Sequence, residues 1–333
     1  MFTRTEIPYH NPLQPEEVTN LVFSGGGILG IAYMGVQSAL ERIGISQQID
    51  NFAGASAGAI YAMLGACEYD ATMLHRTVFS KRFPDLLDTR GNYNLPAIIK
   101  DPSKIALHIV SITNDLFKHH GLCKGYAARE WFGELIESTP RQMSRDVSFE
   151  HLQQVTGKGL YVLGCDLTDQ RYKVFSPKNT PGVAVREAVL ASMSLPFIFQ
   201  PKNIGEHWYL DGGTTMDMPL DIGDPFESKN TLGLLLNTKR DVLTPEPLAI
   251  NSLEDVVGAL FGTILRESTL RLFESQARID QTVFINPLGI DQINFDITDK
   301  QKNDLRNSGY DAVCQYFNKL DLEREEARPE LLF

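Results

Sequence analysis

Four cysteines in 333 residues are too few and too scattered to organise a disulfide framework. Cys67, Cys123, Cys165 and Cys314 include no CxxC pair and no metal-binding spacing. We therefore expect buried free thiols, as in a protein from a reducing compartment, and no metal site built on cysteine.

Long apolar runs and an excess of basic residues are also missing from the sequence. Apolar runs such as Leu232–Leu236 are far too short to span a bilayer, and the polar N-terminal segment does not resemble a signal peptide. The formal net charge of −11 argues against nucleic acid as a partner and against a strong standing attraction to anionic lipid. We expect a cytoplasmic protein that is soluble or bound to membranes only peripherally.

Two glycine-rich turns dominate the most distinctive part of the sequence, residues 19–65. Each turn follows a short apolar run, Asn20–Ser24 or Ile49–Ala53, and each opens an apolar helical pattern. Strand, tight turn and helix, occurring twice in succession, predict a βαβ unit. Because both turns of such a unit lie at the same edge of a parallel sheet, we expect them to face one another.

The second turn reads Gly54-Ala55-Ser56-Ala57-Gly58, which is the Gly-x-Ser-x-Gly spacing of a nucleophile elbow. A serine on a sharp strand-to-helix turn needs small neighbours, because the backbone there is crowded and partly strained. The helix N-terminus also favours negative charge as the hydroxyl loses its proton. In isolation this pattern is typical of an ordinary tight turn; after a glycine-rich first turn it predicts that Ser56 is a nucleophile.

The first turn, Gly25-Gly26-Gly27 followed by Gly30, supplies what such a serine needs. Backbone N–H groups of glycines at a helix start can point at the oxyanion of acyl transfer, and each such donor contributes about 2.7–4 kcal/mol. The spacing also matches a dinucleotide-binding fingerprint, but the second strand ends in Gly54-Ala55-Ser56 and not in the acidic residue that binds ribose. A phosphate-binding loop is disfavoured because Ile31-Ala32 stands where it requires Lys-Ser/Thr.

A serine nucleophile needs a base, and the sequence offers two candidates. Asp211 ends a predicted strand and precedes Gly212 and Gly213, so its carboxylate can lie close to another backbone turn. Asp-Gly is also the commonest signal of a plain hairpin turn, but beside the two glycine-rich turns we favour Asp211 as a base that works without imidazole. The alternative is a triad in which His207 acts with an upstream acid such as Asp166.

A fourth segment, Ala188–Phe199, contains Ala-Ser-x-Ser-x-Pro between the elbow and Asp211. With these four motifs in this order, residues 19–240 resemble the patatin-like phospholipase family. The resemblance implies a three-layer α/β/α sandwich around a mostly parallel sheet. It also implies that Ser56 and Asp211 form a catalytic dyad and that Gly25, Gly26 and Gly27 form the oxyanion hole.

The activity that the resemblance implies is hydrolysis of fatty-acyl esters in phospholipids or lysophospholipids, without a metal or other cofactor. The implied partners are the lipid substrate, a transient membrane surface and, as for many family members, a protein or small-molecule activator. A secreted effector that acts in a host cell is left open. The family often has Arg or Lys at the position of Leu29, so cationic help toward a substrate phosphate is not implied here.

Two other functions compete with this one. The first is a carboxylesterase of the α/β-hydrolase type that uses Ser56 and His207. The second is a lipid-binding module that keeps the fold but is catalytically silent.

The whole chain divides into three predicted parts. They are an N-terminal arm (residues 1–18), the catalytic domain (19–240) and a mainly helical C-terminal extension packed on that domain (241–333). We expect the charged tail Glu323–Arg328 to fray from the end of this extension.

Two further stretches are a basic helical segment, which has two possible interpretations, and an acidic segment after Asp211. Lys104–His120 is an amphipathic helical pattern in a segment, Lys100 to Arg129, that has five Lys or Arg against two Asp. It is either a lipid-facing surface or an ordinary solvated helix. The acidic residues Asp217, Asp221 and Asp224 lack EF-hand spacing and predict a solvated loop.

Overall fold

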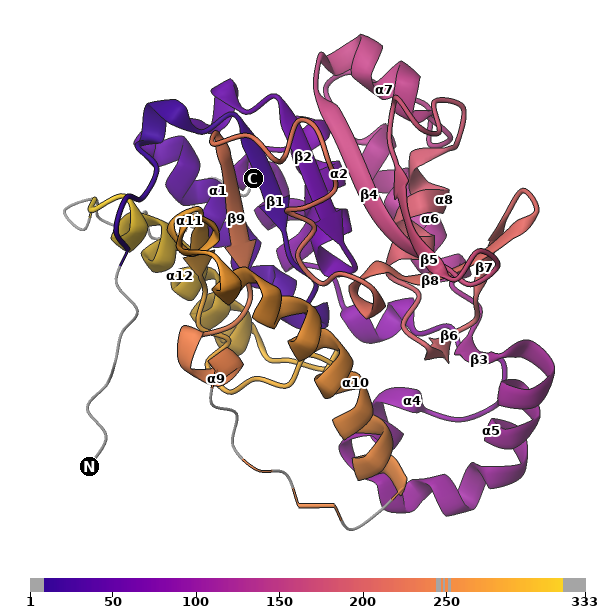
Figure 1. The fold of residues 1–333 in the computed structure, drawn as a ribbon. Helices are drawn as coiled ribbons and strands as arrows, with labels where there is room; N and C mark the ends of the chain where they lie inside the picture. Colours follow the sequence, from indigo (N-terminus) through magenta and orange to yellow (C-terminus); the bar gives the residue numbers. More distant parts are fainter. Residues whose placement is uncertain (1–8, 244–246, 248, 251–252, 320–333) are drawn as a thin grey trace, which may run out of the picture.

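The computed structural model describes residues 9–243, 247, 249–250 and 253–319 (Figure 1). The predicted tail Glu323–Arg328 and the first eight residues of the predicted arm lie outside these ranges. The described part is built on an eight-stranded sheet with the order β10-β9-β1-β2-β4-β8-β7, in which β5 also pairs with β4. The strands are β1 (Asn20–Phe23), β2 (Asn51–Ala55), β4 (Gly159–Asp166), β5 (Arg171–Phe175), β7 (Lys202–Ile204), β8 (His207–Asp211), β9 (Thr231–Leu235) and β10 (Thr282–Phe284).

The sheet is mostly parallel, as predicted. The strands from β10 to β4 all run in one direction, and β5 and β8 pair with β4 in the opposite direction. The predicted βαβ unit is at the centre, because β1 pairs with β2 on one side and with β9 on the other. Its two glycine-rich turns therefore lie at the carboxyl edge of the sheet.

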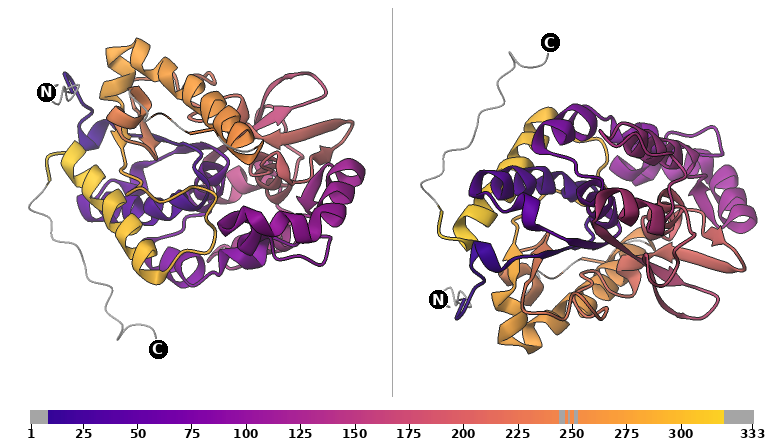
Figure 2. Two further views of the ribbon diagram at one scale, coloured as in Figure 1. Left: turned by 90° about the horizontal axis from the view of Figure 1, so that it is seen from below. Right: turned by 90° about the horizontal axis from the view of Figure 1, so that it is seen from above.

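Both faces of the sheet are covered, which explains the unbroken apolar runs of its central strands. Along β1, Leu21 and Phe23 pack into the main core on one face, whereas Val22 packs on the other face with Met218, Leu220 and Phe226. The predicted three-layer sandwich is therefore confirmed (Figure 2). The main-core layer includes α1 (Ala32–Ile43), α2 (Ala57–Ala66), α6 (Tyr126–Glu137), α7 (Phe149–Thr156), α8 (Val185–Ser192) and α12 (Asp299–Tyr316), and the other includes α9 (Lys239–Leu243) and the end of α10 (Leu253–Leu270).

The chain after residue 240 belongs to the same sandwich. Its strand β10 extends the sheet beside β9, and α12 packs along α1. The two helices approach so closely that a Cβ on Gly35 would lie 1.8 Å from the carbonyl oxygen of Arg306. This segment thus contributes a strand and a covering helix, as well as the short helix α11 (Gln276–Asp280).

A smaller group of elements lies beyond the carboxyl edge of the sheet. It contains α4 (Leu95–Lys100), α5 (Ile105–His119) and the parallel pair of β3 (Gly121–Cys123) with β6 (Phe197–Phe199). Figures 1 and 2 show α4 and α5 on one side of this edge and α10 on the other. The short helix α3 (Ala71–Leu74) leads from α2 toward this region.

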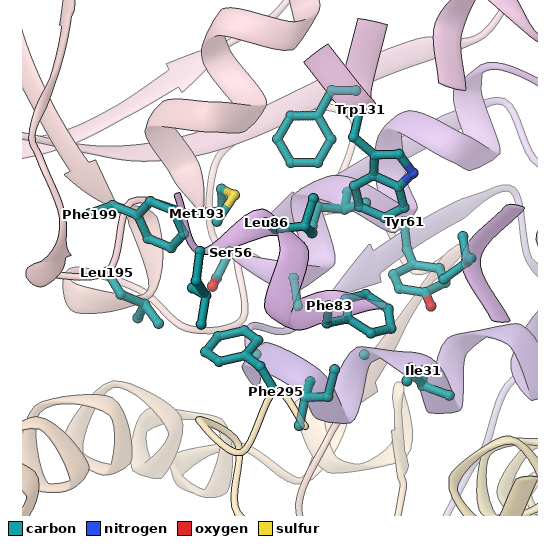
Figure 3. Close-up of a pocket in the computed structure, with 18 residues that line it drawn as sticks. Ile31, Ser56, Tyr61, Phe83, Leu86, Trp131, Met193, Leu195, Phe199 and Phe295 are labelled. Atoms are coloured by element: carbon teal, nitrogen blue, oxygen red, sulfur yellow. The ribbon is translucent and has the colours of Figure 1, made fainter. Parts of the chain in front are cut away.

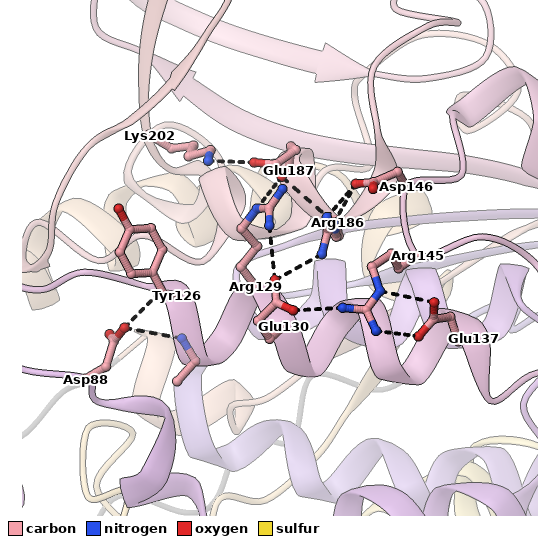
Figure 4. Close-up of polar contacts among 11 residues, drawn as sticks. Asp88, Tyr126, Arg129, Glu130, Glu137, Arg145, Asp146, Arg186, Glu187 and Lys202 are labelled. Carbon is pink, nitrogen blue, oxygen red and sulfur yellow. Dashed lines mark hydrogen bonds and ion pairs between the residues drawn. The ribbon is translucent and has the colours of Figure 1, made fainter.

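A buried arginine ties α6 and α8 together on the main-core side. Arg186 is 4% exposed, and its guanidinium contacts Asp146 at 2.6 Å and Glu130 at 3.2 Å. Figure 4 shows that the network continues through Arg129 and Glu187. Because Asp146 and Glu130 are half-exposed, these ion pairs position α8, which carries the start of the Ala-Ser-x-Ser segment, more than they stabilise the fold.

All four cysteines lie in the described part of the chain and are free thiols, and three of them are buried. This agrees with the sequence analysis. None of the helices in the described ranges combines the length and the apolar character that crossing a bilayer requires.

Candidate active site

Ser56 occupies the sharp turn between β2 and α2. Its backbone has φ +53° and ψ −125°, a left-handed conformation that costs a non-glycine residue about 1–3 kcal/mol. The turn is possible only because its flanking glycines are bare: a Cβ on Gly54 would lie 2.2 Å from the carbonyl oxygen of Gly58. The N–H of Ser56 donates to Oγ of Ser192 at 3.0 Å, so a side chain of the Ala-Ser-x-Ser segment stabilises the backbone of the elbow.

The first glycine-rich turn faces this elbow, as the βαβ unit predicts. A Cβ on Gly25 would lie 3.2 Å from Cβ of Ser56. Two hydrogen bonds to Ser24, the residue before this turn, hold it in place. Tyr33 donates its hydroxyl to the carbonyl oxygen of Ser24 at 2.8 Å, and the N–H of Leu236 donates to Oγ of Ser24 at 3.1 Å. No local pattern in the sequence marks Tyr33 as a residue of this site.

The three predicted oxyanion donors are not equivalent. The N–H of Gly25 donates to the carbonyl oxygen of Asp217 at 3.0 Å, so this predicted donor already has a hydrogen-bond partner. The N–H groups of Gly26 and Gly27 have no hydrogen-bond partner within the part of the chain that is described. These two free donors stand at the start of the 3₁₀ helix Gly27–Ile31, where backbone N–H groups have no partner within the helix.

Asp211 stands beside Ser56 because of the strand register. It ends β8 opposite Gly164 of β4, and the preceding residue of β4, Leu163, pairs with Ala55 at the end of β2. Its N–H donates to the carbonyl oxygen of Ser194 at 3.0 Å, and its Oδ1 accepts the N–H of Gly213 at 2.8 Å. Asp-Gly-Gly therefore forms a helical turn after a strand, and Gly212–Thr214 is a 3₁₀ helix, not a hairpin.

The Asp211 carboxyl is buried, with only 2% of the residue exposed. Burial raises the pKa of Asp211 to about 7, and the nearby Ser56 hydroxyl and the Gly213 N–H offset part of that rise. Its Oδ2 has no hydrogen bond within the described residues, although the Ser56 hydroxyl is close enough to affect the pKa. A carboxyl with an open oxygen and a pKa near neutrality is suited to accept a proton.

A second carboxyl, that of Asp217, belongs to this site, although the sequence predicts a solvated loop there. Asp217 bonds through its backbone to Gly25, and its Oδ1 lies 3.3 Å from the position of a Cβ on Gly213. Burial and then the charge of Asp211 raise the pKa of Asp217 to about 7. The loop prediction is therefore wrong for Asp217, although Asp221 and Asp224 are exposed as expected. The signal that could have identified it is its place between Met216 and Met218.

His207 does not lie beside Ser56. Its Nδ1 lies 2.9 Å from Oδ2 of Asp166, and it precedes Asp211 by four residues on β8, which separates them by about 13 Å along the strand. Asp166, Asp169 and His207 place possible metal-ligand atoms within 4.8 Å of one another. Oδ1 of Asp166 accepts the N–H groups of Thr168 and Asp169, however, so this group already stabilises the turn after β4.

A narrow apolar pocket opens beside Ser56 (Figure 3). Its cavity is about 60 Å³, with Met193, Leu195 and Phe199 near the serine and Tyr61 at the far end. Both predicted turns contribute to its wall, since Gly27, Gly30 and Ser56 line it. Phe83, Leu86, Trp131 and Phe295 complete much of the lining.

The sequence of this chain is similar to a known protein family and to several known proteins. A family model described as patatin-like phospholipase matches residues 21–224. Among relatives, a probable lipid hydrolase, 463L of Invertebrate iridescent virus 6, is 26% identical and covers 67% of this chain and 69% of its own. The protein YqhO of Bacillus subtilis is 29% identical, with 84% of this chain and 91% of its own covered.

The fold is also similar to that of a solved structure. VipD from Legionella pneumophila superposes with a TM-score of 0.57 at 17% identity, over 96% of this chain and 72% of its own. At this identity the likeness supports the fold alone.

Proposed function

Because this chain belongs to the patatin-like phospholipase family, whose model matches more than half of it, we propose that it is a lipid acyl hydrolase with a Ser56–Asp211 dyad. The observation that carries the proposal is the buried Asp211 carboxyl beside a strained serine, at the wall of an apolar pocket. An apolar pocket suits a fatty-acyl chain, so the substrates are acyl esters of phospholipids or lysophospholipids.

The chemistry uses one base twice. Asp211 takes the proton from Ser56 as Oγ attacks the acyl carbonyl carbon, and it then gives this proton to the leaving alcohol. The acyl group stays on Ser56 as an ester. Water then attacks the ester carbon, Asp211 takes its proton, and the fatty acid leaves as Ser56 Oγ takes the proton back.

Charge in the tetrahedral intermediate is stabilised by backbone groups. The free N–H groups of Gly26 and Gly27 donate to the oxyanion, and the N-terminus of α2 adds its favourable dipole. Each N–H donor contributes about 2.7–4 kcal/mol to the transition state. Every step is provided by the chain itself, so the proposal includes no metal and no cofactor.

The direct test is a hydrolysis assay over a panel of phospholipids and lysophospholipids, with the released acids detected by mass spectrometry. We expect fatty-acid release together with covalent labelling of Ser56 by a fluorophosphonate. Folded protein that neither releases acids nor becomes labelled, with and without vesicles, would indicate a lipid-binding module without catalysis.

Replacing His207 distinguishes the dyad from a triad. Because His207 pairs with Asp166 far along β8, we expect His207→Ala to keep kcat/KM for a short-chain ester within about twofold. Thermal unfolding measured in parallel reports any loss of the turn that His207 and Asp166 support. Loss of activity in a fully folded His207→Ala protein would favour the esterase with a histidine base.

The oxyanion assignment is tested at Gly27. A Cβ there would lie 2.3 Å from the carbonyl oxygen of Gln292, so Gly27→Ala must displace the turn. We expect kcat to fall by about 10²–10³-fold, the effect of losing one donor. Gly157→Ala is the matched control, because Gly157 also has a positive φ, +73°, but an added Cβ meets nothing within 4 Å. Equal activities of the two variants would rule out Gly27.

A further inference from the structure

Helix α5 presents an apolar stripe to solvent. Leu107, Val110 and Phe117 are 79%, 81% and 82% exposed, and Ile109 beside them is 50% exposed. The spacing places the first three on one face of the helix, over about 15 Å of its length. Exposed apolar groups gathered in this way mark a contact with another molecule or a membrane.

The opposite side of α5 holds the only acid in the helix. Asp115 is 4% exposed, and its Oδ2 accepts the hydroxyl of Tyr93 at 2.9 Å and the N–H of Gly91 at 3.1 Å. The negative charge of the helix is therefore turned toward the protein. Its outer face carries apolar groups bordered by Lys104 and Lys118. Lys104 pairs with Asp101 at 3.5 Å, whereas Lys118 has no ion pair within the described part of the chain.

The stripe lies on the side of the molecule where the pocket is. Ile112, on the inner face of α5, shares a small core with Leu87 and Phe199, and the latter two also line the pocket beside Ser56. On the other side of the carboxyl edge, α10 exposes Val256 by 48% and Ile264 by 36% (Figures 1 and 2). A flat partner that covers α5 would therefore lie close to the substrate pocket.

We propose that the outer face of α5 docks the protein on an anionic phospholipid bilayer, with Leu107, Val110 and Phe117 inserted among the lipids. The inference rests on the proposed function, since the bilayer is then the source of substrate. An apolar stripe with a lysine border is the pattern of an interfacial helix. The net charge of −11 opposes a general attraction of the protein to anionic headgroups, so the apolar side chains of α5 supply the attachment and the lysine border sets the orientation.

A bilayer explains the stripe better than a protein partner does. A stable protein interface uses about 20–30 residues a side, whereas the exposed apolar group on α5 has four large side chains on one helix. Lysines at the border complement lipid phosphates, which a second acidic copy of this chain does not present.

The test is vesicle flotation in a Ser56→Ala background, so that binding is measured without turnover. The vesicles contain phosphatidylcholine with or without phosphatidylserine. We expect Val110→Ser with Phe117→Ser to lower the bound fraction on anionic vesicles at least about tenfold, because two inserted apolar groups are lost. The matched control, Leu167→Ser with Tyr172→Ser, removes side chains that are 42% and 46% exposed on the β4–β5 hairpin and should bind like the parent.

Each outcome decides the proposal. Absence of binding by the parent, or equal binding by both double variants when circular dichroism shows them folded, overturns the docking face. So does a change from dimer to monomer in sedimentation with unchanged vesicle binding, which would assign α5 to a second copy. Hydrolysis of a soluble short-chain ester by the Ser56-containing protein is measured separately. If the protein does not hydrolyse this ester but still binds vesicles through α5, the proposed function is wrong and the docking face is retained.

Discussion

Ser56→Ala will lower the rate of ester hydrolysis by at least about 10⁴-fold, because removal of a serine nucleophile leaves only the oxyanion donors and the pocket to act on water. The same loss is expected for a soluble short-chain ester and for lipid in vesicles, since both reactions use one hydroxyl. Steady-state kinetics with both substrates, and disappearance of fluorophosphonate labelling, provide the measurement.

The fold should be unaffected by this change. Alanine has the same steric requirement as serine at φ +53°, so the strain of the turn is retained and the melting temperature should hardly move. Ser38→Ala on α1, which removes only a hydrogen bond to the carbonyl of Met34, serves as the control and should keep full activity. A Ser56→Ala protein that still turns over lipid at the parental rate would refute the dyad.

Asp211→Asn will lower kcat by at least about 10³-fold, because an amide of the same shape cannot take the serine proton. The parent should show a rate that rises with pH through about 7 and then levels, since the base must be deprotonated and burial raises the pKa of Asp211 to about 7. The charge of Asp211 raises the pKa of Asp217, so these two carboxyls lose their protons in two coupled steps, and the buried hydroxyl of Tyr33 also faces Asp217. The residual activity of Asp211→Asn should not follow this rise.

The same substitution should stabilise the protein. A carboxyl whose pKa is raised from 3.8 to about 7 by folding binds more protons in the folded state between these pH values, so the free energy of unfolding falls as pH rises through that window. Above pH 7 the ionised Asp211 costs at most about 4 kcal/mol, and Asp211→Asn removes that cost. Denaturant unfolding at pH 5 and pH 8 measures it; an equal effect of the substitution at both pH values would contradict a buried, raised carboxyl.

Much of the site could be predicted because it depends on local backbone patterns. Glycine spacing identified both turns, and the parallel βαβ unit implied that they face one another. Helix α2 (Ala57–Ala66) begins directly after the elbow, where the sequence shows an apolar helical pattern, since small residues at the elbow and an apolar helix are both local features. The predicted strand ends were correct within about two residues, the usual uncertainty of strand and helix boundaries.

Features that depend on distant contacts could not be predicted in this way. The donor of Gly25 is taken by the carbonyl of Asp217, 192 residues later, as its hydrogen bond shows, and no local pattern reveals such a pairing. For the same reason the sequence around Asp217 predicts a solvated loop. Strands β3 and β6 have three residues each, too few for an alternating pattern to be recognised.

The contact between Gly27 and Gln292 also has a consequence for biosynthesis. The N–H of Ile28 donates to the carbonyl oxygen of Gln292 at 3.0 Å, so the oxyanion turn receives one of its supports from a residue that the ribosome adds long after Ser56 and Asp211. A nascent chain that already contains Ser56 and Asp211 still lacks this support. A chain that stops between Asp211 and Gln292 would therefore contain Ser56 and Asp211 but would leave the first glycine-rich turn without this hydrogen bond.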